Sequence, residues 1–261
     1  MHFGAGNIGR GFFGQLYHES GYHIIFVDII DGIIKAINEN GQYPIWLIGD
    51  KSEKIIIDNI SGISLKNENE VIDTGAKLDL ISFSVGANNV KAIVPILAKI
   101  VEKKFSLNQS GFLNIIIGEN LKNASNLLKQ WIIQYLPEDY NNILKERVGL
   151  VETVLSRMVP VVSDELKKQN PLIVLVEPYK TMPVAKNMFK GRIPDVKGFL
   201  MLDNIEPCQA MKLYIHNFTH AAFAYAGYKK NYKYIWEVVE DKKIGHLVQK
   251  AYLEISQALH K

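Results

Sequence analysis

The feature that most limits how this chain can fold is a glycine pattern at its start. Gly4, Gly6 and Gly9 have the spacing G-x-G-x-x-G, and a short apolar strand fragment precedes them. From Ile8 onward, apolar residues recur every four positions at Ile8, Phe12 and Leu16, which predicts a helix. Residues 23–28 then form a buried apolar segment that ends in Asp28. This order of strand, turn, helix and strand is typical of the first part of a parallel α/β sheet that binds a dinucleotide.

Each part of the glycine turn has a physical role in such binding. Gly4 permits a tight turn, Gly6 lets the backbone approach a pyrophosphate, and Gly9 lets helix and strand pack closely. The N-terminus of the helix offers N–H donors and a positive dipole to the phosphates. The residues expected to contact the cofactor are Gly4, Ala5, Gly6, Asn7, Ile8 and Gly9. The alternative is a glycine-rich turn that binds no ligand.

Asp28 indicates which dinucleotide the turn would bind. It lies 19 residues after Gly9, at the end of the second predicted strand. An acid at this place accepts hydrogen bonds from the ribose hydroxyls of adenosine and repels a 2′-phosphate. The sequence therefore favours NAD over NADP.

Strands and helices continue to alternate through the first half of the chain. Residues 45–48 and 55–57 suggest a short hairpin, whereas 78–85, 113–117 and 148–154 read as buried strands. This alternation predicts a Rossmann-type, doubly wound parallel sheet. Gly86 and Asn88 follow the strand at 78–85 and are expected beside the cofactor, with ordinary turn chemistry as the alternative.

Asn120 lies just after the predicted strand at 113–117, where ligands of such sheets bind. Its amide has the donors to hold a substrate oxygen. An equally good reading makes it the N-cap of a helix over residues 123–135.

The pattern changes in the second half. A strand at 172–176 lies within a proline-rich, irregular region, and helical patterns follow at 209–228, 235–240 and 244–260. We expect an NAD-binding Rossmann domain over residues 1–155 and a mainly helical substrate and catalytic domain over residues 156–261.

Polar side chains in the first of these helices suggest a reaction. Lys212, His216 and His220 share one face of an α-helix, and Asn217 is one residue further round. Oxidation of an alcohol without a metal needs a base for the hydroxyl proton and donors for the alkoxide. The alternative is a polar helix face in solvent, and His216 fits a structural role as well as a site.

The turn from Gly4 to Gly11, combined with K-x-x-x-x-N-x-x-H from Lys212 to His220, resembles the polyol-specific long-chain dehydrogenases. The likeness covers most of the chain and includes 84–86, 119–120, 157–160, 171–172 and 176–177. It implies an NAD-dependent, metal-independent enzyme that interconverts D-mannitol 1-phosphate and D-fructose 6-phosphate.

The same resemblance implies roles for four residues. Lys212 is the general base, Asn217 and Asn120 hold the alkoxide or ketone oxygen, and His220 orients the substrate and supports the lysine. A free lysine has a pKa of about 10.4, and burial beside an imidazole and the nicotinamide charge is expected to lower it. Arg157, Lys180 and Arg192 are cations available to a substrate phosphate, with nothing in the sequence to choose among them.

Composition limits the other partners. A net charge of +3 with scattered lysines does not indicate a nucleic-acid partner, and no apolar stretch approaches the roughly 18–20 residues of a membrane span. A single cysteine, Cys208, excludes an internal disulfide and fits a reducing cytoplasm. We expect a cytoplasmic monomer or small homo-oligomer whose partner is a small-molecule sugar or polyol phosphate.

Three departures from the family pattern leave alternatives open. Family members extend further at the C-terminus, the strand before Gly4 is short, and Ser156 and Met182 replace the usual Asp and Trp. The chain is therefore expected to be truncated at the C-terminus. The alternatives are a related polyol or hexuronate dehydrogenase and a truncated, inactive NAD-binding module.

Overall fold

The computed structural model describes residues 1–49, 53–107 and 110–259. The chain forms two compact units, Met1–Asp203 and Asn204–Lys261. Within the described residues, we find no helix that combines the length and the apolar character needed to cross a membrane.

The first unit contains a six-stranded sheet in which every neighbouring pair is parallel. Its strands are β1 (His2–Phe3), β2 (Ile24–Asp28), β5 (Ile60–Ser64), β6 (Leu80–Phe83), β7 (Leu113–Ile117) and β8 (Val148–Glu152). The spatial order is β5-β2-β1-β6-β7-β8, so the chain winds outward in both directions from β1. This is the order of a doubly wound Rossmann sheet, which confirms the expected fold class. The switch point lies between β1 and β6.

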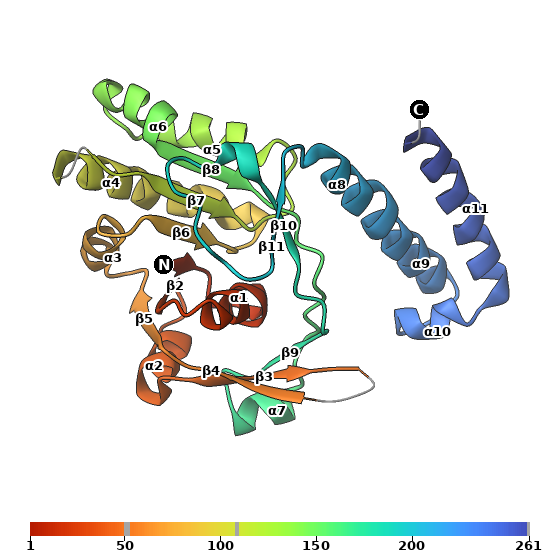
Figure 1. Cartoon of the computed structure of the whole chain (residues 1–261). Coiled ribbons are helices and arrows are strands. Elements are labelled where there is room, and N and C mark those ends of the chain that lie inside the picture. Colours follow the sequence, from red (N-terminus) through yellow and green to blue (C-terminus); the bar gives the residue numbers. More distant parts are fainter. Residues whose placement is uncertain (50–52, 108–109, 260–261) are drawn as a thin grey trace. The chain divides into compact units, whose positions relative to one another are not determined.

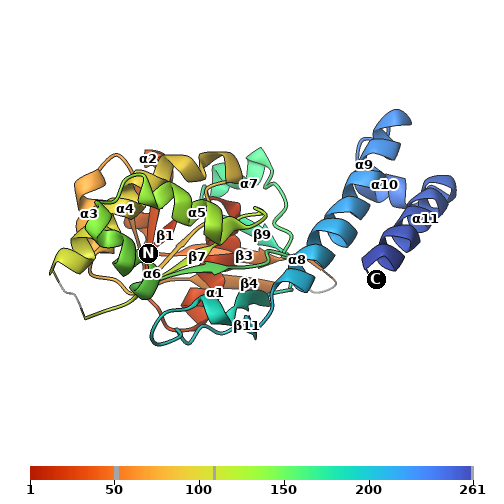
Figure 2. The ribbon, with the colours of Figure 1, turned by 90° about the horizontal axis from the view of Figure 1, so that it is seen from above.

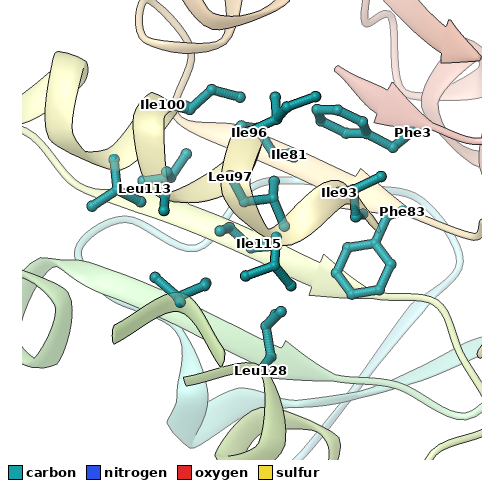
Figure 3. Close-up of a cluster of buried hydrophobic side chains, with 14 of the residues drawn as sticks. Phe3, Ile81, Phe83, Ile93, Ile96, Leu97, Ile100, Leu113, Ile115 and Leu128 are labelled. Atoms are coloured by element: carbon teal, nitrogen blue, oxygen red, sulfur yellow. The ribbon is translucent and has the colours of Figure 1, made fainter. Parts of the chain in front are cut away.

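Helices cover both faces of this sheet, and each face has its own apolar core. On one face, α4 (Val90–Leu107) and α5 (Ala124–Ile133) lie along the strands in both views (Figures 1 and 2). Ile93, Ile96, Leu97 and Ile100 of α4 point toward the side chains of the central strands (Figure 3). The core of the opposite face forms around α1 (Gly14–Glu19) and α2 (Asp31–Asn40).

The remaining helices of this unit are short. They are α3 (Glu68–Gly75), α6 (Asn141–Arg147) and α7 (Asp164–Gln169), with 3₁₀ turns η2 (Ala87–Asn89), η3 (Glu138–Tyr140) and η4 (Lys186–Met188).

A second, three-stranded sheet packs beside the first helix. The expected hairpin is confirmed, because β3 (Tyr43–Leu47) pairs antiparallel with β4 (Glu53–Ile57). The expected strand near 172–176 is β9 (Val174–Val176), which pairs parallel with β3. A Cβ added to Gly11 of the first helix would lie 2.7 Å from Val174, so glycine is needed for this close packing.

The division between the units differs from the boundary expected after residue 155. Residues 156–203 rejoin the first unit through β9, which pairs with β3, and through β10 (Met182–Ala185), which contacts β8 and pairs parallel with β11 (Phe199–Leu202). An isolated bridge between Thr153 and Val184 adds a further link. These strands are short and their partners are distant in sequence, which is why the proline-rich segment resembled the start of a new domain.

The first helix begins with a π turn, η1 (Gly9–Phe13). The amide of Gly14 donates to the carbonyl of Gly9, five residues back, so the carbonyl of Arg10 lacks its usual α-helical partner. The buried hydroxyl of Tyr43 donates to that carbonyl at 2.7 Å. The next carbonyl, of Gly11, accepts from Arg157 at 2.9 Å. The π turn is therefore held by side chains from distant parts of the chain.

The second unit consists of helices. They are α8 (Glu206–Met211), the π segment η5 (Lys212–Asn217), α9 (Phe218–Lys229), α10 (Ile235–Val239) and α11 (Lys242–Leu259). The expected helices are confirmed in type, although the first begins at Glu206 and contains the π segment. The last residue of the third expected helix, His260, lies outside the described residues. Within the unit, Val238, Ile244 and Val248 form the buried core.

Candidate functional site

The glycine turn follows β1 at the switch point of the sheet. Gly4 has a φ of +97°, a conformation that favours glycine, and its amide donates to the carbonyl of Val27 at 2.8 Å. A Cβ on Gly4 would lie 2.8 Å from the carbonyl carbon of Ser84, which directly follows β6. Only glycine at position 4 therefore lets the turn fit between the ends of β2 and β6, the strands on either side of β1.

Gly6 and Gly9 have different reasons to be glycine. A Cβ on Gly9 would lie 2.9 Å from the imidazole of His2, so the packing of helix on strand requires its small size. Among the described residues, a Cβ on Gly6 would have no neighbour within 4 Å, and the φ of Gly6 lies outside the region that favours glycine. No residue that the structure describes therefore requires glycine at position 6. The open space above this backbone fits a ligand that approaches it closely, as a pyrophosphate does.

Asp28 ties the end of β2 to the glycine turn. Its Oδ2 accepts from the amide of Ala5 at 2.7 Å, and its Oδ1 accepts from the amide of Ile30 at 2.9 Å. The sequence pointed only to a ribose contact and missed this backbone role. A carboxylate has about four lone-pair sites, so these two bonds leave acceptors for ribose hydroxyls.

A histidine beneath the turn was not identified from the sequence. His2 is fully buried, and its ring nitrogens lie 2.7 Å from Ser82 Oγ and 2.9 Å from Ser84 Oγ. Burial lowers the pKa of His2 to about 3, so the ring is neutral at physiological pH. A polar residue at an otherwise apolar central strand position was the one signal available in the sequence.

The loop after β6 carries Gly86 and Asn88, and both are exposed. Gly86 has a φ of +88°, and its amide donates to Oε1 of Glu119 at 2.8 Å. Asn89 closes the loop by donating from its side chain to the carbonyl of Val85 at 2.9 Å. The structure thus brings the loops after β6 and β7 together through Glu119, a residue the sequence did not single out for the site.

Asn120 is exposed and directly follows Glu119. The N-cap of α5 is Asn123, so the alternative reading of Asn120 as that cap is wrong. The start of α5 is held instead by Glu152 at the end of β8, whose Oε1 accepts from the amide and the hydroxyl of Ser125, both at 2.8 Å. Asn120 lies at the carboxyl edge of the sheet, between the end of β7 and this cap.

The three basic side chains considered as partners of a substrate phosphate have different surroundings. Arg157 is buried and donates to the carbonyls of Glu177 and Gly11 and to Gln15 Oε1, at 2.7–2.9 Å. Burial lowers the pKa of Arg157 to about 10. Lys180 pairs with Glu19 at 2.8 Å, and Arg192 is exposed. Arg157 therefore joins segments of the first unit rather than facing solvent.

The polar motif of the second unit lies on a π turn, whereas the sequence predicted a regular α-helix. The segment η5 begins at Lys212 and ends at Asn217. A π turn bonds each residue to the fifth one along, so residues five apart come onto one face. Lys212 and Asn217 have this spacing, which in an α-helix would separate them. The rings of His216 and His220 have centroids 4.8 Å apart, so those two residues share a face as predicted.

The structure thus groups the predicted residues in two sets. Gly4 through Gly9, Asp28, Gly86, Asn88 and Asn120 lie at the carboxyl edge of the sheet in the first unit, and Lys212, Asn217 and His220 lie on one helix of the second. Among the described residues, no group of three or more His, Cys, Asp or Glu side chains could hold a metal ion.

The strand order and the glycine turn define the first unit as a Rossmann domain. Residues 1–198 match the family model of the mannitol dehydrogenase Rossmann domain, and residues 204–261 match that of the mannitol dehydrogenase C-terminal domain. The chain belongs to the mannitol dehydrogenase family, which confirms the resemblance drawn from its motifs.

Curated relatives carry the name mannitol-1-phosphate 5-dehydrogenase. The protein from Thermoanaerobacter pseudethanolicus is 37% identical over all of this chain and 66% of its own length. The one from Bacillus subtilis (strain 168) is 34% identical over all of this chain and 68% of its own length. The chain thus spans about two thirds of the length of these relatives.

Solved structures share the fold. Mannitol 2-dehydrogenase of Pseudomonas fluorescens, determined as a ternary complex with NAD and D-mannitol, superposes with a TM-score of 0.79 at 15% identity. The match covers 97% of this chain and 62% of that one. A substrate-free D-sorbitol dehydrogenase gives a TM-score of 0.81 at 15% identity over 95% of this chain and 62% of that one.

Proposed function

We propose that this chain is the catalytic part of an NAD-dependent, metal-independent polyol-phosphate dehydrogenase that interconverts D-mannitol 1-phosphate and D-fructose 6-phosphate. The observation that carries the proposal is the π segment whose first and last residues are Lys212 and Asn217. It presents an amine and a carboxamide on one face, as alcohol oxidation requires. The name shared by the curated relatives supports the choice of substrate.

The cofactor site is proposed to be the turn from Gly4 to Gly9 with Asp28, Gly86 and Asn88. The open space at Gly6 and the backbone donors of the helix start fit a pyrophosphate. Asp28 keeps acceptors for the ribose hydroxyls, and its charge disfavours the 2′-phosphate of NADP. NAD, when bound, supplies the acceptor for the hydride from the substrate carbon.

The protein's own residues handle the proton and the oxygen. The amine of Lys212 takes the hydroxyl proton as the C–H bond breaks, and the carboxamides of Asn217 and Asn120 donate hydrogen bonds to the oxygen that becomes the ketone. His220 orients the substrate and supports the lysine. Two amide donors on one oxygen form an oxyanion-type site, in which each donor contributes about 10²–10³ in rate.

Replacement of the proposed base gives the direct test. With D-mannitol 1-phosphate and NAD, Lys212→Ala is expected to lower kcat by about 10²–10⁴, measured as NADH formation by absorbance, because a positioned base contributes this much. Lys229→Ala, at the end of α9, is the matched control and should leave kcat unchanged.

Assays with a panel of substrates separate this proposal from the two alternative functions. Turnover of mannitol or a hexuronate, but not of mannitol 1-phosphate, would show a related polyol or hexuronate dehydrogenase instead. NADH binding without turnover of any of these compounds would make the chain an NAD-binding module without catalytic activity.

A further inference from the structure

The loops that follow β6 and β7 begin side by side. The amide of Gly118, just after β7, donates to the carbonyl of Phe83, the last residue of β6, at 2.9 Å. One loop then carries Gly86 and Asn88, the proposed cofactor contacts, and the other carries Asn120, the proposed donor to the substrate oxygen. Whatever fixes these two loops to each other also fixes the cofactor relative to that donor.

The carboxylate of Glu119 makes the link between them. Its Oε1 accepts from the amide of Gly86 at 2.8 Å, across 33 positions of sequence. Gly86 has a φ of +88°, so this loop adopts a backbone that favours glycine. The rest of the loop is closed on itself, because the amide of Asn89 donates to the carbonyl of Gly86 at 2.8 Å.

The carboxylate of Glu119 is partly removed from water. The side chain is half-buried, and burial raises the pKa of Glu119, while hydrogen bonds from the amides of Gly86 and Val85 oppose that rise. No ion pair within residues 1–49, 53–107 and 110–259 involves it. Partial burial of a carboxylate without a cation is costly, so Glu119 is not expected to add to the stability of the fold.

The segment that carries Asn120 is fixed at its far end as well. Ser125, in the first turn of α5, donates its amide and hydroxyl to Glu152, which is buried at the end of β8. Asn120 therefore lies between two carboxylate anchors, one to the loop after β6 and one to the end of β8. Of the two, Glu119 is adjacent to Asn120 and is the one that reaches the proposed cofactor loop.

We propose that Glu119 is a positioning residue for the hydride-transfer site: its carboxylate fixes the loop carrying Gly86 and Asn88 relative to the amide of Asn120. This inference rests on the proposed function, since it assigns to Glu119 the alignment of cofactor and substrate oxygen. The requirement is for an acceptor at the right distance, and negative charge is not needed.

Three substitutions at one position test this requirement. Glu119→Gln keeps the acceptor and the length but removes the charge, Glu119→Asp keeps the charge but is one methylene shorter, and Glu119→Ala removes both. We expect Glu119→Asp and Glu119→Ala to weaken NADH binding about tenfold and to lower kcat by about tenfold or more, because a lost hydrogen bond and a small misplacement each have such effects. Glu119→Gln should stay within about threefold of the unmodified chain in both measurements.

The readouts are the Kd of NADH by fluorescence titration, kcat and KM with mannitol 1-phosphate, and the midpoint of urea unfolding. All three variants should unfold at or near the urea concentration of the unmodified chain, and Glu138→Ala, an exposed acid in η3, is the control. A merely structural role would instead lower the midpoint in parallel with activity. If Glu119→Ala does not fold, comparing the NADH affinity and kcat of Glu119→Asp with those of Glu119→Gln still tests the positioning role.

The outcomes separate this inference from the proposed function. Failure of the unmodified chain to bind NADH would overturn both proposals. An active chain in which Glu119→Asp matches the unmodified protein, or in which Glu119→Gln is as impaired as Glu119→Ala, would overturn the positioning role alone. If NADH binds without turnover, the Kd values of Glu119→Asp and Glu119→Gln test the link to the loop at Gly86 by themselves.

Discussion

At the scale of single residues, two glycines of one turn have separable roles. Gly4 needs its positive φ and its closeness to β6, whereas Gly6 has an ordinary φ and open space around it. We expect Gly6→Ala to change the free energy of unfolding by less than about 1 kcal/mol while weakening NADH binding more than about tenfold, because the new methyl group occupies the place of the pyrophosphate.

Gly4→Ala is the companion variant, and it should destabilise the fold by about 2 kcal/mol or more, through the strain of a positive φ and through the clash of the new Cβ with the backbone of Ser84. Urea unfolding without ligand and fluorescence titration with NADH measure the two effects separately. Unchanged NADH affinity in Gly6→Ala would show that no ligand approaches this backbone, and the proposed cofactor site would have to be abandoned.

At the scale of elements, the π turn at the start of the first helix depends on a bond from another strand. Tyr43, buried in β3, donates to the carbonyl of Arg10, whose usual α-helical donor, the amide of Gly14, bonds to Gly9 instead. Tyr43→Phe keeps the ring and removes the donor, so we expect a loss of about 1–3 kcal/mol in the free energy of unfolding, the cost of a buried unsatisfied carbonyl. Urea denaturation measures this loss.

Tyr135→Phe serves as the control for that substitution, because Tyr135 is 53% exposed and its hydroxyl can exchange to water. A loss in Tyr43→Phe no larger than in this control would mean that the Arg10 carbonyl finds another donor and that the π turn does not depend on β3.

The same element shows what the sequence could and could not predict. The glycine spacing, the buried strands and Asp28 were readable because each depends on residues close together in sequence. The π turns at Gly9–Phe13 and Lys212–Asn217 were not readable, since π and α turns have similar composition and the choice depends on bonds such as that from Tyr43.

Elements with weak local patterns were missed for a related reason. Strand β5 (Ile60–Ser64) has a glycine in its centre, and β10 and β11 are four residues each, so only their partners identify them as strands. The contact between Glu119 and Gly86 spans 33 positions and left no sequence signal. By contrast, the predicted roles of Lys212, Asn217 and His220 stay predictions until activity is measured.

At the scale of the whole molecule, the two units differ in the size of their own cores. The first unit has a large apolar cluster on each face of its sheet, and all five residues of β7 are buried. The second, a unit of 58 positions, has a core of three buried residues among those the structure describes: Val238, Ile244 and Val248. Local stability follows the amount of apolar surface that a segment buries.

Amide hydrogen exchange should therefore be slower in the first unit, which has the larger core, than in the second. We expect amides in the middle of α11 to exchange about two orders of magnitude faster than those of β7, because local opening exposes less apolar surface. NADH at 100 times its Kd should add up to about 2.7 kcal/mol to the opening free energy of β7, through binding to the folded first unit. Mass spectrometry of exchanged peptides, with and without NADH, gives both values. Equal protection of α11 and β7 without ligand would show that the small core of the second unit does not limit its stability, and an NADH effect absent from β7 would contradict binding at the switch point of the sheet.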